Sequence, residues 1–265
     1  MKIKYALVIT LFFVAFTLPI NAQKTLSKII KNGEIRVGLS GNQPPYSMKS
    51  KTGELMGLEV DLANALASGM GVKLAVEVMP FSELLPALKA GKIDAVMSGM
   101  TVTTARSEDV LFAGPYTVSG KSILAKTSVL SNMKGTEQAN NAAYKISFLK
   151  GSTSETFVKK YMPKAQAMPV ENYDEAIAMV LNDEVDAMVA DYSICVITIM
   201  RNQGKDLVTL ESPLNIEPIA MALPAGDLHF LNLVENYLKA FDMAGALDLL
   251  DKKWLKDGSW LFNME

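Results

Sequence analysis

The sequence has few of the residues on which metal and thiol chemistry depend. It contains one cysteine, Cys195, and one histidine, His229, in 265 residues. A single cysteine cannot form an internal disulfide, and neither residue belongs to the paired spacing of a zinc site. A phosphate-binding loop of the Gly-x-x-x-x-Gly-Lys type and a nucleophile elbow are also missing. We therefore expect neither a metal nor a cofactor.

Charge of either sign is modest. The formal net charge is -2, and 20% of the residues are charged while 49% are hydrophobic. This balance is typical of a globular protein with one large or two modest domains. No basic stripe is present, which argues against a nucleic-acid partner. Cys195 lies in the apolar run 194–199, so we expect it to be buried.

The longest apolar run is also short, and it lies at the start of the chain. Lys2 and Lys4 precede the run from Tyr5 to about Phe16, and the small residue Ala22 follows. A membrane-spanning helix needs roughly 20 apolar residues, so we interpret residues 1–22 as a signal peptide that is cleaved near Ala22. A membrane anchor is the alternative. No cysteine stands at the cleavage point, which argues against a lipid anchor, and we expect a periplasmic protein.

Two similar apolar segments end in residues of opposite charge. Ile93 to Met97 resembles a buried strand, and the polar segment from Ser98 to Arg106 follows it. Val185 to Ala190 repeats this pattern and is followed directly by Asp191. One strand therefore leads to a guanidinium, and the other leads to a carboxylate.

Apolar periodicity predicts helices and strands in alternation, which is typical of parallel-rich sheets with helical crossovers. The first half has helix 59–68, strand 72–79 and helix 83–90, for which Ser82 is the expected cap. The extended runs 111–126 and 211–223 are expected to cross between two α/β lobes. The expected division is lobe 1 at 23–115 and 220–265, lobe 2 at 121–214, and hinge strands at 116–120 and 215–219.

Ligands of such sheets bind beyond the carboxyl ends of the strands. Ser40, Phe81, the segment from Gly99 to Arg106, and Asp191 all fall at that end of their predicted units. We therefore expect these residues to meet in a cleft between the two lobes.

Several motifs, taken in order, resemble one family. The chain is similar to the extracellular solute-binding proteins of family 3, the amino-acid receptors of ABC importers. The resemblance covers nearly the whole chain after the signal peptide. The motifs that carry it are Gly57 to Leu62, Ser98 to Thr103 with Arg106, Pro115-Tyr116, Gly151 to Glu155, and Asp186 to Asp191.

The resemblance implies a type II periplasmic-binding-protein fold and a role for each matching residue. Arg106 would bind the α-carboxylate of the ligand through two parallel hydrogen bonds. Thr101 would add its hydroxyl and amide, and Thr153 would add an N–H at the start of a helix. Asp191 would bind the α-ammonium together with the carbonyl of Gly99.

The side-chain pocket is expected around Phe81 and the first loop. The family's partners would be a free amino acid and a membrane permease, and we expect a monomer. The full set of expected ligand-binding residues is Ser40, Gln43, Tyr46, Phe81, Ser98, Gly99, Thr101, Arg106, Ser152, Thr153, Asp191 and Glu217.

Each assignment has a purely structural alternative. Arg106 could be a solvated arginine at a helix start, and Asp191 could cap the helix 192–201. Ser152 and Thr153 precede Glu155 in the pattern of a helix cap. Phe81 could be an ordinary core residue.

An enzyme is the alternative from another functional class. The fold also resembles periplasmic cyclohexadienyl dehydratases, which need a general acid that faces the leaving hydroxyl. Glu217 is the first candidate for this acid, and Glu59 is the second.

The first loop bears on the identity of the ligand. Family members that bind cationic amino acids commonly carry an acidic residue where this sequence has Ser40, and an aromatic residue where it has Gln43. Ser40, Asn42 and Gln43 are hydrogen-bonding groups, so we expect a polar amino acid. Glu217 could supply a negative charge instead.

Overall fold

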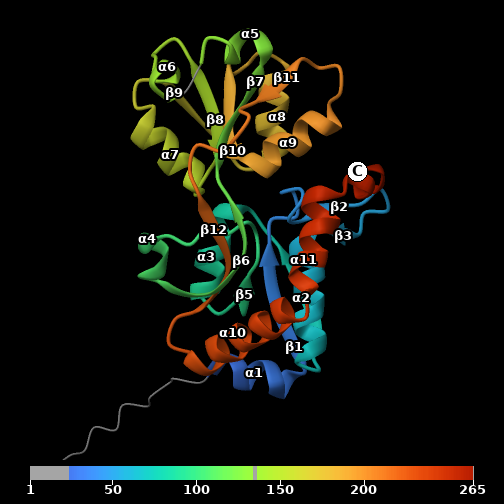
Figure 1. Cartoon of the computed structure of the whole chain (residues 1–265). Helices are drawn as coiled ribbons and strands as arrows, with labels where there is room; N and C mark the ends of the chain where they lie inside the picture. Colours follow the sequence, from blue (N-terminus) through green and yellow to red (C-terminus); the bar gives the residue numbers. More distant parts are fainter. Residues whose placement is uncertain (1–23, 134–135, 265) are drawn as a thin grey trace, which may run out of the picture.

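The computed structural model describes residues 24–133 and 136–264. The predicted signal peptide, residues 1–22, lies outside this part of the chain. The described residues form two α/β lobes, each built on a five-stranded sheet (Figure 1). This is the fold predicted from the sequence. Within these ranges, no helix is long and apolar enough to cross a membrane.

Lobe 1 contains the sheet with strand order β4-β1-β5-β12-β6. β1 pairs in parallel with β4 and β5, whereas β12 pairs in antiparallel fashion with β5 and β6. The sheet is therefore mixed, because the crossing strands add antiparallel pairs to a parallel half. Its elements are α1 (Lys24–Asn32), β1 (Glu34–Leu39), β2 (Met48–Lys49), β3 (Leu55–Met56), α2 (Leu58–Gly69), β4 (Lys73–Val78), α3 (Phe81–Lys89), β5 (Ala95–Val96), α4 (Thr104–Ser107), β6 (Val110–Ser119), β12 (Glu217–Pro224), α10 (Leu228–Met243), α11 (Ala246–Asp251), the π-helical η1 (Lys252–Lys256) and the 3₁₀ helix η2 (Gly258–Asn263).

Lobe 2 contains the sheet with strand order β11-β7-β10-β8-β9. β8 pairs in parallel with β9 and β10, and β7 pairs in antiparallel fashion with β10 and β11. Its elements are β7 (Lys121–Lys126), α5 (Thr127–Leu130), α6 (Thr136–Ala139), β8 (Lys145–Leu149), α7 (Thr153–Tyr161), β9 (Gln166–Val170), α8 (Tyr173–Leu181), β10 (Ala187–Asp191), α9 (Tyr192–Arg201) and β11 (Leu207–Thr209).

Two connections cross between the lobes. One runs from β6 through Gly120 into β7, and the other runs from β11 into β12; Figure 1 shows β6 and β12 side by side at the crossing. The connections touch at Gly120, where an added Cβ would lie 1.9 Å from the carbonyl oxygen of Asn215. Only glycine allows this close approach, so the two connections are packed backbone to backbone.

The first loop is docked on the N-terminus of α2. The N–H groups of Leu58 and Glu59 donate to the carbonyl oxygens of Pro45 and Tyr46, both at 3.0 Å. Gly57 precedes the helix with φ of 140°, and a Cβ there would lie 2.2 Å from the Tyr46 carbonyl oxygen. A glycine is therefore required for the loop to reach the helix.

Apolar side chains fill the interior of both lobes, and Cys195 is among them. It is buried and forms no disulfide, and burial raises the pKa of its thiol to about 12. The residue therefore packs as a small apolar side chain at neutral pH.

Candidate functional site

The segment after β5 is laid along β12. Val102 donates its N–H to the carbonyl oxygen of Pro218 at 2.9 Å, and Ala220 donates to that of Met100 at 3.1 Å. Thr101 also forms an isolated antiparallel bridge with Ile219. These bonds place the Thr101 side chain beside Glu217, at the start of β12.

Gly99 has a left-handed backbone conformation, with φ of 57°. A Cβ at this position would lie 3.3 Å from the Tyr46 ring and 3.5 Å from the amide nitrogen of Gln43. Tyr46, Gln43 and Gly99 therefore lie together in lobe 1.

Arg106 connects the two lobes directly. Its Nη1 donates to the carbonyl oxygen of Thr101 at 2.8 Å, and its Nη2 donates to that of Gly151 in lobe 2 at 3.2 Å. The guanidinium also lies over the Phe81 ring, 5.6 Å from its centroid. Burial lowers the pKa of Arg106, although Glu217 and Asp191 nearby oppose this shift. Arg106 is thus half-buried and oriented, and it is not a solvated surface arginine.

Asp191 ends β10 and precedes α9, but its side chain does not cap that helix. Its Oδ1 instead accepts a hydrogen bond from Nζ of Lys121. The two residues are direct cross-strand partners in the antiparallel pair of β10 and β7. Cross-strand partners on one face lie close enough for their side chains to pair, so the register of the sheet explains the contact.

Glu217 lies between the lobes and accepts hydrogen bonds from both. The hydroxyls of Thr101 in lobe 1 and Thr153 in lobe 2 each donate to its Oε2 at 2.8 Å. Lys121 Nζ lies 2.9 Å from the same oxygen, and Asn215 donates to Oε1 at 3.0 Å. Burial alone would raise the pKa of Glu217, but Lys121 and these donors lower it overall. Glu217 is therefore ionised at neutral pH.

Lys121 is buried between two carboxylates. Burial alone would lower its pKa, but Asp191 and Glu217 raise it overall, so it remains an ammonium. The pKa of Asp191 is raised by burial and by the second carboxylate, Glu217, in spite of Lys121. The site thus contains a buried chain of charges, Asp191, Lys121 and Glu217. The two acids were expected from the sequence, and Lys121 was not.

Hydroxyls of the first loop and of β5's end form a second polar cluster. The Ser40 hydroxyl donates to Gln43 Oε1 at 2.6 Å, and the Ser98 hydroxyl donates to the same oxygen. The Ser40 N–H donates to Ser98 Oγ at 3.0 Å. Ser40, Gln43 and Ser98 are buried and uncharged, so this part of the site offers hydrogen bonds without net charge.

The start of α7 is capped by Ser152. Ser152 accepts from the N–H groups of Ser154 and Glu155 at 3.1 and 3.4 Å, and its hydroxyl donates to the Leu149 carbonyl oxygen at 2.6 Å. Ser152 is therefore a helix cap. Thr153 points elsewhere, with its hydroxyl 3.4 Å from that of Thr101 across the lobes.

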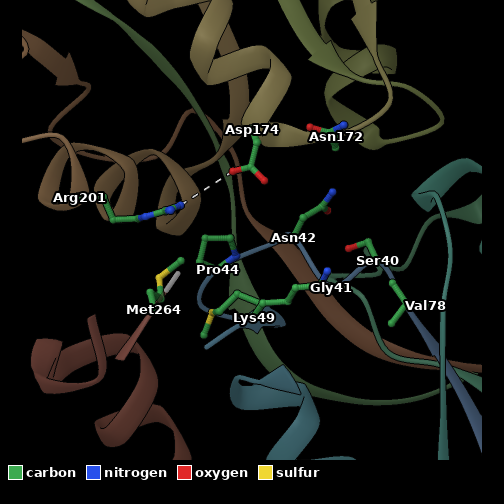
Figure 2. A pocket seen from close by; sticks show the side chains of 11 residues that line it. Ser40, Gly41, Asn42, Pro44, Lys49, Val78, Asn172, Asp174, Arg201 and Met264 are labelled. Carbon is green, nitrogen blue, oxygen red and sulfur yellow. Dashed lines mark ion pairs between the residues drawn. The ribbon is translucent and has the colours of Figure 1, made fainter. Parts of the chain in front are cut away.

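A cavity of about 550 Å³ opens between the lobes beside the first loop. Figure 2 shows Asn172, Asp174 and Arg201 of lobe 2 facing the first loop across it, with Asp174 and Arg201 3.9 Å apart. The buried Oδ1 of Asn42 has no hydrogen-bond donor within the described part of the chain. The lobe 1 lining is Ser40, Gly41, Asn42, Pro44, Met48, Lys49, Val78 and Met264.

A second cavity, of about 400 Å³, adjoins Arg106, Thr153 and Glu217. The buried residues Ser98, Gly99, Thr101 and Asp191 line neither cavity. Ser98 and Gly99 bond to other residues of lobe 1, Asp191 pairs with Lys121 in lobe 2, and the Thr101 hydroxyl lies 3.4 Å from that of Thr153 across the lobes.

Glu59 is fully buried beneath the site. Its Oε1 accepts from the Gly99 N–H at 2.7 Å and from the Tyr116 hydroxyl, whereas its Oε2 has no donor among the described residues. Burial raises its pKa to about 7, in spite of these two hydrogen bonds. Glu59 therefore supports Gly99 from below and changes its protonation near neutral pH.

This raised pKa predicts a pH dependence of folding. Because folding favours protonated Glu59, its contribution to stability is complete below pH 4.5 and is lost as the pH rises to about 7. Relative to Glu59→Gln, the wild-type free energy of unfolding should fall by about 3 kcal/mol from pH 4.5 to 7.5. Urea denaturation of both proteins over this range measures the difference. A constant difference would show that Glu59 titrates normally.

Comparisons with known proteins identify a family and several relatives. The family model described as bacterial extracellular solute-binding proteins, family 3, matches residues 35–257. The ABC transporter glutamine-binding protein of Bacillus subtilis is 28% identical over 237 residues, which are 88% of this chain and 85% of that protein.

Two further relatives are an enzyme and an ancestral binding protein described as a precursor of that enzyme. Cyclohexadienyl dehydratase of Pseudomonas aeruginosa is 24% identical over 234 residues, 88% of this chain and 87% of that enzyme. The crystal structure of an ancestral amino acid-binding protein, a precursor of cyclohexadienyl dehydratase, superposes with a TM-score of 0.83 at 37% identity, over 88% of this chain and all of that one.

Proposed function

The chain belongs to the bacterial extracellular solute-binding proteins of family 3, and from this premise we propose that it binds a free L-amino acid between its lobes. The bound amino acid would be delivered to the permease of an ABC importer. We further propose that the protein is exported, that its signal peptide is cleaved near Ala22, and that it acts as a monomer.

The observation that carries this proposal is the placement of Arg106 and Asp191. They belong to different lobes, yet each is close enough to affect the pKa of the other. A guanidinium can pair with an α-carboxylate, and a carboxylate can pair with an α-ammonium. Two opposite charges in one site between lobes match the two charged ends of a zwitterion.

Closure would follow from the same arrangement. The lobes already meet through Arg106 and Gly151, and through the hydroxyls of Thr101 and Thr153 on Glu217. A ligand that contacts both lobes favours the closed conformation over an open one. We propose that residues 116–120 and 215–219 are the hinge, because the crossing connections lie there.

The surroundings of the cavity favour a polar side chain on the ligand. Ser40 and Asn42 line the cavity with uncharged polar groups, and Asn42 Oδ1 has no donor among the described residues. A ligand whose side chain carries an N–H or O–H group would supply that donor and avoid the cost of a buried unpaired acceptor.

A thermal-shift screen of the twenty L-amino acids tests the proposal. A ligand at about 100 times its Kd stabilises the protein by about 2.7 kcal/mol, which raises the Tm of a chain of this size by roughly 5 to 10 °C. The D-enantiomers are the control, since a D-amino acid cannot place all three of its α-substituents in the same way. If no L-amino acid raises the Tm, the proposed ligand class is wrong.

We propose that the protein is a receptor and not a dehydratase. Glu217, the first candidate for a general acid, is ionised at neutral pH because Lys121, Asn215 and Thr101 lower its pKa in spite of its burial. Glu59 has a raised pKa, but it is fully buried below Gly99. Neither residue combines a proton with access to a substrate. Formation of an aromatic product from prephenate or arogenate would contradict this proposal.

A further inference from the structure

Lys121 is a buried cation of the site that neither end of a zwitterion requires. The side chains of Lys121, Asp191 and Glu217 are 2%, 4% and 8% exposed, so all three charges are shielded from water. The Lys121 ammonium contacts both Asp191 Oδ1 and Glu217 Oε2. Lys121 is therefore a fixed part of the site and cannot turn out into solvent.

The charges of Arg106, Lys121, Asp191 and Glu217 balance. Arg106 and Lys121 supply two cations, and the two carboxylates that Lys121 Nζ contacts, Asp191 and Glu217, supply two anions. A zwitterion adds one charge of each sign and preserves this balance. A ligand with a charged side chain would instead leave one uncompensated charge in a poorly solvated site, which is costly.

The ion pair of Lys121 with Asp191 can remain intact while a ligand binds. Lys121 meets Oδ1 of Asp191, so Oδ2 is the atom that an incoming ammonium would meet. Glu217 already has four donors, from Thr101, Thr153, Lys121 and Asn215. The Glu217 carboxylate is therefore already paired within the protein, so it would attract a cationic ligand side chain only weakly.

We propose that Lys121, through its ion pair with Glu217, restricts the receptor to amino acids whose side chain carries no net charge. The inference rests on the proposed function and narrows its ligand class. An amino acid with a charged side chain would bind more weakly, because the site offers no opposite charge to pair with that side chain.

The test uses three amino acids of similar length and different charge: L-glutamine, L-lysine and L-glutamate. Calorimetry gives their Kd values for the wild type, Lys121→Met, Glu217→Gln and the double variant. The wild type should prefer glutamine at least tenfold. Lys121→Met should shift the ratio of Kd values at least tenfold toward lysine, and Glu217→Gln should shift it at least tenfold toward glutamate. The double variant should return to the wild-type ratios, because both charges are removed.

Lys126→Met is the matched control. Lys126 ends the same strand, β7, and pairs with Asp183, which is largely exposed. This variant should leave all three Kd values within about twofold of the wild type, because exposed pairs contribute little. Glu217→Gln keeps the pair of Lys121 with Asp191, so it tests the inference alone if Lys121→Met does not fold.

Three results would overturn the inference. One is a wild-type preference for lysine or glutamate, and another is unchanged Kd ratios in single variants that still bind. The third is loss of all binding in a single variant without recovery in the double variant, which would make the pair purely structural. A wild type that binds no amino acid at all contradicts the proposed function itself.

Discussion

Arg106→Ala is expected to weaken the binding of every L-amino acid by at least about 100-fold. The guanidinium is oriented by the Thr101 carbonyl oxygen and by the Phe81 ring, and it faces the lobe boundary at Gly151. Removing one partner of a buried, hydrogen-bonded charge pair costs roughly 2–5 kcal/mol. Because every amino acid carries the same α-carboxylate, the loss should be uniform across side chains. Calorimetric titration of the ligands found by thermal shift measures it.

Two further variants serve as controls for the loss of affinity in Arg106→Ala. Arg106→Lys keeps the charge but not the planar pair of donors, so an intermediate loss is expected. Lys89→Ala removes an exposed cation of the same lobe, paired with Asp109, and should leave binding unchanged. If Arg106→Ala affected some amino acids and spared others, Arg106 would contact side chains and not the shared carboxylate.

Asp191→Asn is the second change with a large expected effect. It removes the carboxylate that would receive the α-ammonium, and Glu217 then remains as the ionic partner of Lys121 within the described residues. The affinity for all α-amino acids should fall by at least about 100-fold, since an amide cannot compensate the ammonium charge. Calorimetry at constant pH measures the change.

Asp186→Asn is the control for Asp191→Asn, because Asp186 directly precedes β10 and Asp191 ends it. Asp186 accepts the Lys145 N–H at 2.7 Å and takes no part in the site. Asp186→Asn should leave every Kd within about twofold of the wild type. An equal loss in both variants would mean that β10 had been disturbed as a whole, and that Asp191 has no specific contact with the ligand.

The two strand ends could be predicted from the sequence because they follow local patterns. An apolar run followed by glycine and polar residues is visible without any three-dimensional information, and so are its repeat and the terminal Asp191. Alternating strands and helices then place such ends at one edge of each sheet. The two-lobed fold follows from these regularities together with the family resemblance, and so does the expectation that Arg106 and Asp191 share one site.

Lys121 could not be found in this way, because its role depends on strand register. The residue begins an apolar run, and a lysine at a strand start is usually solvated. Only the antiparallel pairing of β7 with β10 places it opposite Asp191. A lysine followed by an apolar run, close to a predicted hinge, is the one signal that could have drawn attention to it.

Side-chain geometry shows which of the expected helix caps and core residues have these structural roles. Asp191 stands where a helix cap would stand, yet its carboxylate pairs with Lys121 and leaves the cap empty. The expected cap at Ser82 is wrong, because α3 begins at Phe81 and Pro80 precedes it. Proline fixes a backbone angle compatible with a helix start, and this competes successfully with a serine cap. Phe81 is both a buried core residue and the platform of Arg106.

Titration of the protein with one amino acid and its two α-modified analogues tests the central claim most directly. The claim is that a zwitterion binds between Arg106 and Asp191. The amino acid with the largest thermal shift is compared by calorimetry with its α-carboxamide, which lacks the carboxylate, and with its deaminated acid, which lacks the ammonium. Both analogues should bind at least about 100-fold more weakly than the amino acid. An analogue that binds as tightly as the amino acid would contradict the claim, since one of the two charges would then have no partner in the site.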